Sequence, residues 1–137
     1  REDGATQVML TNDGRPVAAY SAVEECQRLT GEWGGAIAAS AFGDEFDAAG
    51  VPFEPLSGQD FAAACGLLAD GITNRTVRHG NQVALNDSVK AVEWRPPTIT
   101  GERAFVLRDA PNAGPAAAAA RALWGLNKGI GGGFNVW

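Results

Sequence analysis

Apolar residues recur along the chain with two kinds of spacing, one typical of helices and one typical of strands. A period of three to four residues predicts a helix, and a short apolar run bounded by glycine or proline predicts a strand. The predicted helices span residues 22–33, 43–50, 57–71, 81–92 and 115–126. The predicted strands span residues 6–11, 16–21, 36–42 and 51–56, followed by two short strands about Gly101. This alternation predicts an α/β domain with a mixed sheet flanked by helices.

Three local signals refine this pattern. The Asp-Gly pair at 13–14 predicts an antiparallel hairpin between the first two strands. Ser57 and Asp60 have the spacing of a capping box and mark a helix start. Pro115 suits the first turn of the last helix, and the alanine run after it would let that helix lie close to a sheet.

Composition indicates one globular domain. The chain has 137 residues, 45% of them hydrophobic, which is enough for a core over residues 1–126 followed by a glycine-rich tail over 127–137. No apolar run approaches a membrane span and no signal-peptide pattern opens the sequence, so we expect a cytoplasmic protein without a membrane partner. Cys26 and Cys65 fall inside predicted helices, which favours buried reduced thiols, with a single disulfide as the alternative.

The net charge of −5 is unevenly distributed along the chain. Residues 1–74 carry three arginines against twelve acids, whereas residues 75–108 carry six basic residues against three acids. Such asymmetry can form a local anion-binding face on an acidic protein. The alternative is a solvated surface on which the charges cluster by chance.

Several common catalytic motifs are absent from the sequence. There is no G-x-x-x-x-G-K-[ST] phosphate loop for ATP hydrolysis and no G-x-S-x-G nucleophile elbow. There is also no C-x-x-C pair, and a single histidine, His79, cannot form a usual zinc site. The kind of catalysis that the sequence still allows is chemistry in which carboxylates bind divalent metal ions.

Several motifs follow one another between Gly50 and Leu126. They are Gly-Val at 50–51, then QDFAAAC, RTVRHGNQVAL, an Arg-Asp pair and ALWGL. In this order they resemble the C-terminal nuclease domain of the large terminase subunit of tailed bacteriophages and prophages. The resemblance implies an RNase H-like fold that cuts concatemeric double-stranded DNA in the host cytoplasm during genome packaging. It also implies packaging partners, namely the ATPase half of the motor, the portal and the small terminase.

The resemblance implies a site in which acids hold two Mg²⁺ or Mn²⁺ ions for phosphodiester hydrolysis, because these hard cations prefer oxygen ligands. Asp44 matches the middle acid, with Asp47 next to it. Asn112 stands where the family has its last acid, and Asp109 could replace it. The implied catalytic and metal-binding residues are therefore Asp44, Asp109 and Asn112, and they must meet at one sheet edge. A neutral amide at 112 would weaken metal binding.

Each of these residues also has a local alternative role. Asp44 and Asp47 could be exposed acids at a helix start, where they favour the dipole. Asn112 could cap the last helix, and Asp109 could neutralise Arg108. The family's leading acid lies on a first strand that has no clear counterpart here, so the fold could lack that strand. Glu2 and Asp3 are the acids nearest to its expected place.

The basic segment supplies the expected DNA contacts. In the resemblance, His79 belongs to a basic turn near the DNA, where it would contact phosphate with Arg75 and Arg78. Lys90 and Arg95 extend the same basic segment. The alternative for His79 is a solvated side chain in a polar turn.

Three functions are therefore compatible with the sequence. The first is a metal-dependent endonuclease domain of a phage packaging terminase. The second is a catalytically silent module of the same ancestry that binds DNA or packaging partners through its basic segment. The third is an unrelated acidic α/β domain that binds a small ligand or a protein.

Overall fold

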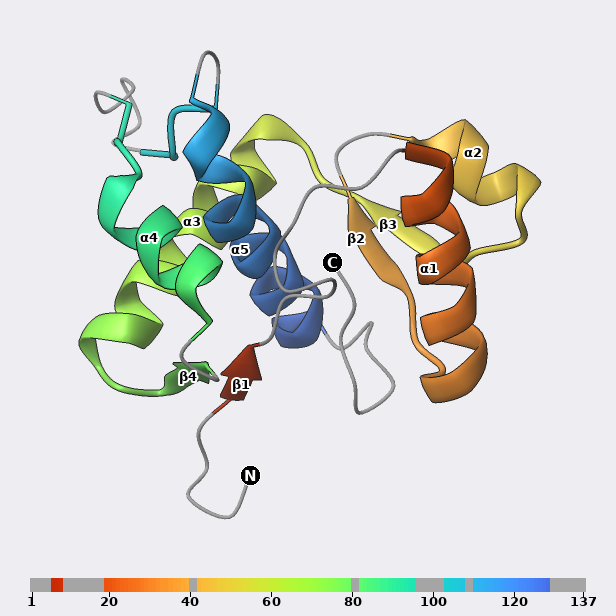
Figure 1. Cartoon of the computed structure of the whole chain (residues 1–137), viewed down its shortest axis with the longest axis horizontal. Helices are drawn as coiled ribbons and strands as arrows, with labels where there is room; N and C mark the ends of the chain where they lie inside the picture. Colours follow the sequence, from red (N-terminus) through yellow and green to blue (C-terminus); the bar gives the residue numbers. More distant parts are fainter. Residues whose placement is uncertain are drawn as a thin grey trace.

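The computed structural model describes residues 6–8, 19–39, 42–79, 82–95, 103–107 and 110–128. Helices and short strands alternate along this part of the chain (Figure 1). In order, the elements are β1 (Thr6–Val8), α1 (Ala19–Trp33), β2 (Ile37–Ala39), α2 (Gly43–Ala48), β3 (Phe53–Pro55), α3 (Gly58–Thr73), β4 (Val77–His79), α4 (Val83–Ala91), the 3-10 turn η2 (Pro111–Ala113) and α5 (Gly114–Asn127).

The described strands form two separate parallel pairs. β2 pairs with β3, with Ile37 opposite Phe53, and β1 pairs with β4, with Thr6 opposite Val77. An isolated antiparallel bridge joins Trp94 and Phe105, where the sequence predicts two short strands. The α/β class is confirmed, but these strands form two parallel pairs and a bridge in place of one continuous mixed sheet.

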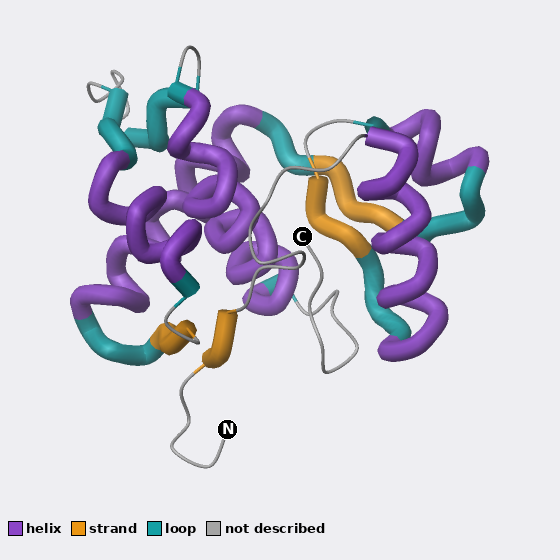
Figure 2. Tube along the Cα trace, in the orientation of Figure 1, coloured by secondary structure: helices purple, strands orange, loops and turns teal. Residues whose placement is uncertain are grey.

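β2 lies between two hydrophobic cores. Successive side chains of a strand point to opposite faces, so Ile37 enters the core beneath α1 and α2, while Ala38 enters the core of α3 and α5. Figure 2 shows this layering, with the β2–β3 pair between the helices at the right and those at the left. Both residues are only 1% exposed. The strand therefore joins two packed regions.

The two regions differ in charge, and we name them accordingly. The acidic lobe comprises residues 19–56 and carries seven acids and one basic residue, Arg28. The basic lobe comprises residues 57–128, together with β1, which pairs with β4. Residues 57–128 carry eight basic residues and six acids. In Figure 1 the acidic lobe lies at the right and the basic lobe at the left.

Alanines allow α5 to approach its neighbours closely. Ala116, Ala119 and Ala120 are fully buried, and α5 contacts α3, α4 and β2. The methyl side chains are small enough for both a helix and a strand to pack on one helix. The predicted close packing of this helix against a sheet strand is confirmed at β2, with α3 as an additional neighbour.

The helix positions follow the sequence patterns closely. Ser57 and Asp60 form the predicted capping box, with the Asp60 amide donating to Ser57 Oγ at 3.1 Å and the Ser57 amide donating to Asp60 at 3.0 Å. The predicted strand over 16–21 is wrong at residues 19–21, which form the first turn of α1. Residues 9–18 lie outside the described part, so the predicted hairpin cannot be compared there. Among the described helices, none has both the length and the apolar character needed to cross a membrane.

Candidate nucleic-acid interface and metal-ligand positions

A buried serine joins α4 to the start of α5. Ser88 is 2% exposed, and its hydroxyl donates a hydrogen bond to the backbone carbonyl of Asn112. The same oxygen accepts a hydrogen bond from the Ala116 amide at 3.0 Å. Ser88 therefore satisfies one of the orphan amides in the first turn of α5, a task that a local cap residue usually performs. It also fixes the η2 turn against α4.

Asn112 is exposed and does not cap α5. The residue before the helix is Ala113, and no side chain of the turn accepts a hydrogen bond from the helix start. The local alternative in which Asn112 caps the helix is therefore wrong. Because Ser88 binds the backbone carbonyl of Asn112, the amide side chain is not needed for that bond and is accessible to solvent.

Asp44 lies in the first turn of α2 and is exposed, as is Asp47 on the same helix. The residue before this helix, Phe42, has a φ of 65°, in the left-handed region, and its side chain is 50% exposed. That backbone conformation is uncommon for a bulky residue. Asp44 therefore follows a strained turn at the carboxyl end of β2, which is the side of a parallel sheet where ligand sites usually form.

Asp44 and Asn112 lie on elements that pack against different neighbours. α2 packs against β3, whereas η2 packs against α4 and α5. In Figure 1, α2, α3 and α5 all begin at the upper end of the molecule, but α2 lies at the right and the start of α5 lies left of centre. Within the described residues, no three His, Cys, Asp or Glu side chains form a group that could hold a metal ion. These residues alone therefore do not fit the implied two-metal site.

Some of the implied ligands lie outside the described residues. These are Asp109, together with Glu2 and Asp3, the acids nearest to the missing first strand. The backbone of His79 is described in β4, but its side chain is not. The placement of Asp109 and of the His79 imidazole therefore stays a prediction.

Arg75 ends α3 in an unusual conformation. Its φ is 60°, its amide donates to the Ile72 carbonyl at 3.3 Å, and the Thr76 amide donates to the Gly71 carbonyl at 2.9 Å. This pair of bonds is a Schellman motif, in which glycine usually occupies the left-handed position. An arginine in this conformation is strained by about 1–2 kcal/mol relative to glycine. Its side chain is exposed.

Arg78 and Lys90 lie near an apolar groove between α3, β4 and α4. The groove has a volume of about 200 Å³, and Lys90 lines it together with Ile72 and Val77. Arg78 follows Val77 directly in β4 and is exposed. The predicted contacts Arg75, Arg78 and Lys90 are therefore carried by the elements that surround this groove.

Arg95 belongs to a different part of the basic lobe. Its amide donates to the Ala104 carbonyl at 2.8 Å, beside the Trp94–Phe105 bridge. Arg103, which is not among the DNA contacts predicted from the sequence, lies across this bridge with its Cζ 5.0 Å from the centre of the Trp94 ring. This contact could not be read from sequence spacing, because it depends on the pairing of two segments.

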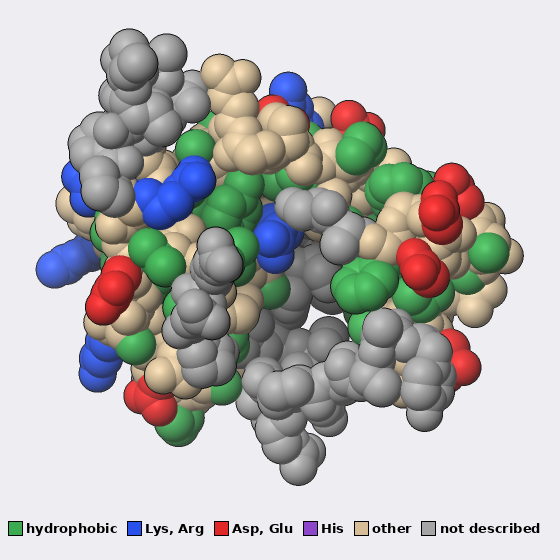
Figure 3. Space-filling view, turned by 90° about the horizontal axis from the view of Figure 1, so that it is seen from above, with side chains coloured by type: hydrophobic (Ala, Val, Ile, Leu, Met, Phe, Trp, Pro, Cys, Tyr) green, Lys and Arg blue, Asp and Glu red, His purple; other side chains and the backbone are tan. Residues whose placement is uncertain are grey.

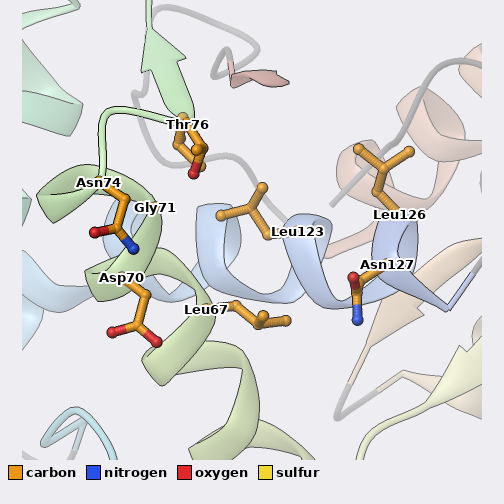
Figure 4. A pocket seen from close by; sticks show the side chains of 9 residues that line it. Leu67, Asp70, Gly71, Asn74, Thr76, Leu123, Leu126 and Asn127 are labelled. Atoms are coloured by element: carbon orange, nitrogen blue, oxygen red, sulfur yellow. The ribbon is translucent and has the colours of Figure 1, made fainter. Parts of the chain in front are cut away.

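A second cavity, of about 440 Å³, lies at the far end of α5 from Asn112 (Figure 4). Leu67 and Leu123 form its apolar part, and Asp70, Asn74 and Asn127 carry polar groups around it. No basic side chain lines this cavity among the described residues. A carboxylate without a nearby cation would repel phosphate, so the cavity does not suit a nucleic-acid backbone.

Neither cysteine provides a reactive nucleophile. Both are buried free thiols, as predicted. Burial raises the pKa of Cys26 to about 11. Burial also raises the pKa of Cys65, whose sulfur accepts a hydrogen bond from the Phe105 amide at 3.4 Å. A thiol with a raised pKa stays protonated at neutral pH and does not attack substrates.

The space-filling view separates the charges of the two lobes (Figure 3). Asp and Glu side chains gather at the right, over the acidic lobe, with a few at the left. Lys and Arg side chains lie at the left and toward the middle, over the basic lobe. The predicted charge asymmetry therefore appears as two differently charged surfaces.

The fold is similar to that of two solved phage nucleases. The nuclease domain of the large terminase of Thermus phage P74-26 is 16% identical and superposes with a TM-score of 0.59 over 83% of this chain and 62% of that chain. The large terminase nuclease of thermophilic phage G20c is 17% identical, with a TM-score of 0.56 over 83% of this chain and 64% of that chain. Neither a protein-family model nor a curated protein matches the sequence.

The chain therefore has the RNase H-like α/β fold of phage large terminase nuclease domains. It spans less than two thirds of the length of these two neighbours. At this level of identity the similarity concerns the fold alone, which confirms the fold that the resemblance implied.

Proposed function

We propose that this chain is the nuclease module of a phage DNA-packaging terminase and that it binds double-stranded DNA through its basic lobe and cuts it. The observation that carries the proposal is the fold, which matches two phage terminase nuclease domains over 83% of the chain. Packaging proteins, including the ATPase half of the motor, the portal and the small terminase, are the partners that this function would require.

The charge of the basic lobe supports the DNA-binding part of the proposal. Arg75, Lys90, Arg95 and Arg103 are exposed, and the structure gives none of them an ion pair with a described acid. Cations that remain unneutralised within the protein are available to attract an anionic backbone. DNA binding of this kind should weaken steeply as salt is added.

Cutting is proposed to depend on Mg²⁺ or Mn²⁺, with Asp44, Asp109 and Asn112 as the candidate ligands. The described residues do not form such a site by themselves. Asp44 and Asn112 are exposed, and each carries a side-chain oxygen that could bind a metal ion. Asp44 follows the carboxyl end of β2, and Asn112 directly precedes α5.

Asn112 favours a second candidate function, a catalytically silent DNA-binding module. The resemblance places an acid at this position, and an amide carries no charge to attract a divalent cation. Loss of the charge would leave the fold and the basic lobe intact. The same chain could then still bind DNA or packaging partners.

Plasmid cleavage in Mn²⁺ or Mg²⁺ distinguishes the two functions. Cleavage that is lost in Asp44→Ala or Asp109→Ala supports the nuclease, whereas DNA binding without cleavage at any metal concentration supports the silent module. Failure of the wild-type chain to retain DNA at low salt would contradict both. That result would leave the unrelated ligand- or protein-binding domain as the remaining alternative.

Asn112→Asp provides a gain-of-function test. Because Ser88 binds the backbone carbonyl of residue 112, the substitution should preserve the η2 turn. If a weak metal ligand limits the enzyme, Asn112→Asp should cut at lower Mn²⁺ concentrations than the wild type. A variant that folds normally and shows no change in its metal requirement would exclude Asn112 from the metal site.

A further inference from the structure

Arg103 is an exposed cation of the basic lobe that lies over an aromatic ring, that of Trp94, and it is not among the DNA contacts predicted from the sequence. The Arg103 guanidinium lies 5.0 Å from the centre of the Trp94 ring, within the range of a cation–π contact. The other side of this aromatic unit is fixed, because Trp94 packs edge-on against Phe105 with 4.8 Å between ring centres. Phe105 is 4% exposed and belongs to the core of the basic lobe.

The backbone beneath this pair is also held in place. The Arg95 amide donates to the Ala104 carbonyl at 2.8 Å, and the Val106 amide donates to the Glu93 carbonyl at 2.7 Å. These bonds place Arg103 on the same face of the paired segments as Trp94, because alternate residues share a face. Phe105 and the paired backbone therefore hold the Trp94 ring in place, and the Arg103 guanidinium lies over that ring.

A cation–π contact leaves the hydrogen-bonding groups of Arg103 available. A guanidinium that lies over a ring uses its flat face, while its N–H donors point outward in its own plane. Those donors match two oxygens of one phosphate group. Because the side chain is already positioned, binding would cost less conformational entropy than for a free arginine. Arg103 is exposed, and no described acid forms an ion pair with it.

We infer that Arg103, positioned by Trp94, is a further phosphate contact of the basic lobe with the DNA backbone. This inference rests on the proposed DNA-binding function and adds a contact to the predicted ones at Arg75, Arg78 and Lys90. The segment that carries Arg103 continues through a hydrogen bond from the Ala110 amide to the Leu107 carbonyl into η2. The contact therefore lies on the same part of the chain that leads to Asn112.

Salt-dependent binding of a fluorescein-labelled DNA duplex, followed by anisotropy, tests the inference. Arg103→Gln should weaken binding severalfold and should reduce the slope of log affinity against log salt by about one. Arg28→Gln is the matched control, because it changes net charge equally in the acidic lobe, where Arg28 already pairs with Glu25 and Glu32. The control should leave the slope unchanged.

Two further variants separate positioning from charge. Arg103→Lys keeps the charge but loses the two-pronged geometry, so it should retain the salt slope and lose part of the affinity. Trp94→Phe keeps an aromatic ring and should bind better than Trp94→Leu. If Trp94→Leu fails to fold, Arg103→Lys and Trp94→Phe still measure the effect.

The possible outcomes distinguish this inference from the proposed function. If wild-type chain binds DNA, and Arg75→Gln and Arg78→Gln weaken binding while Arg103→Gln behaves like Arg28→Gln, the inference is overturned and the proposed DNA binding stands. If the wild-type chain does not bind DNA at low salt, both are overturned. A reduced salt slope in Arg103→Gln alone supports the inference.

Discussion

The acidic and basic lobes hold their cations in different ways. In the acidic lobe, Arg28 is neutralised by Glu25 and Glu32, its neighbours along α1. In the described part of the basic lobe, Arg103, Arg121 and Lys128 lie over the rings of Trp94, Phe61 and Trp124. A ring positions a cation without cancelling its charge. Arg103 is exposed and forms no ion pair with a described acid, so the basic lobe presents a positioned positive charge at this point.

The lobes also end their helices differently. α1 is followed by Gly34 with a φ of 76°, whereas α3 is followed by Arg75 with a φ of 60°. Glycine adopts the left-handed conformation without steric cost, and arginine does not. The acidic lobe thus has the residue that favours stability, and the basic lobe has a strained cation. The end of α3 therefore places a cation at a position where glycine would be more stable.

The largest expected effect concerns the separate cores. Phe46→Ala should lower the free energy of unfolding by about 3–5 kcal/mol, because it leaves a cavity in the acidic-lobe core. Hydrogen exchange should rise in α1 and α2 and much less in α3 and α5. Phe105→Ala should give the reverse pattern. If Phe46→Ala does not fold, Phe46→Leu tests the same point. Equal changes of hydrogen exchange in both lobes would contradict the division of the molecule into two cores.

The second effect compares two hydroxyl groups. Ser88→Ala should destabilise the fold by about 1–3 kcal/mol, because it leaves the Asn112 carbonyl and the Ala116 amide without their partner. Thr30→Ala is the control in the acidic lobe, where the hydroxyl donates only to carbonyls of its own helix, those of Cys26 at 2.9 Å and Gln27 at 3.3 Å. Urea denaturation measures both losses. Equal losses would mean that the hydrogen bonds from Ser88 to the start of α5 stabilise the fold no more than a hydroxyl bond within one helix.

The third effect separates strain from charge at Arg75. Arg75→Gly should raise the free energy of unfolding by about 1 kcal/mol, because glycine relieves the left-handed strain. Arg75→Gln keeps the strain and should leave stability nearly unchanged. Both variants should weaken DNA binding to a similar degree. A stabilised Arg75→Gly that binds DNA as well as the wild type would show that the arginine serves no DNA contact.

The smallest effect is expected for the ion pairs of the acidic lobe. Arg28→Gln should leave the free energy of unfolding almost unchanged, because exposed ion pairs are screened by solvent. Thermal unfolding at low and high salt measures the change. A large loss that disappears in high salt would show that α1 depends on these pairs more than their exposure suggests.

The sequence predicted the long elements better than the short ones. The helix patterns at 57–71 and 115–126 extend over several turns and include a capping box and an early proline, so α3 and α5 are confirmed. β4 was missed although it is no shorter than β2 and β3, because those strands lie in apolar runs bounded by glycine or proline, whereas Val77 is the only apolar residue of β4. Residues 19–21 were assigned to a strand, although they extend α1, in which alanine is a strong helix former.

The site was less predictable than the fold, because its contacts join distant segments. Nothing around Ser88 in the sequence indicates a bond to residue 112, which lies 24 positions away. The Arg103–Trp94 contact likewise depends on two segments that meet at an isolated bridge. The basic character of this region was visible in the sequence, but which cations are positioned became clear only from the packing. Asp44, Asp109 and Asn112 stay predictions as metal ligands.

The position of β2 limits how this chain could be divided or recombined. A cut after residue 56 would remove Ala38 from the buried alanines of α5 and expose them to water. Neither half would then be expected to remain monomeric and soluble. An exchange of the first half with that of a distant relative would succeed only if the incoming strand carried a side chain as small as alanine at this position.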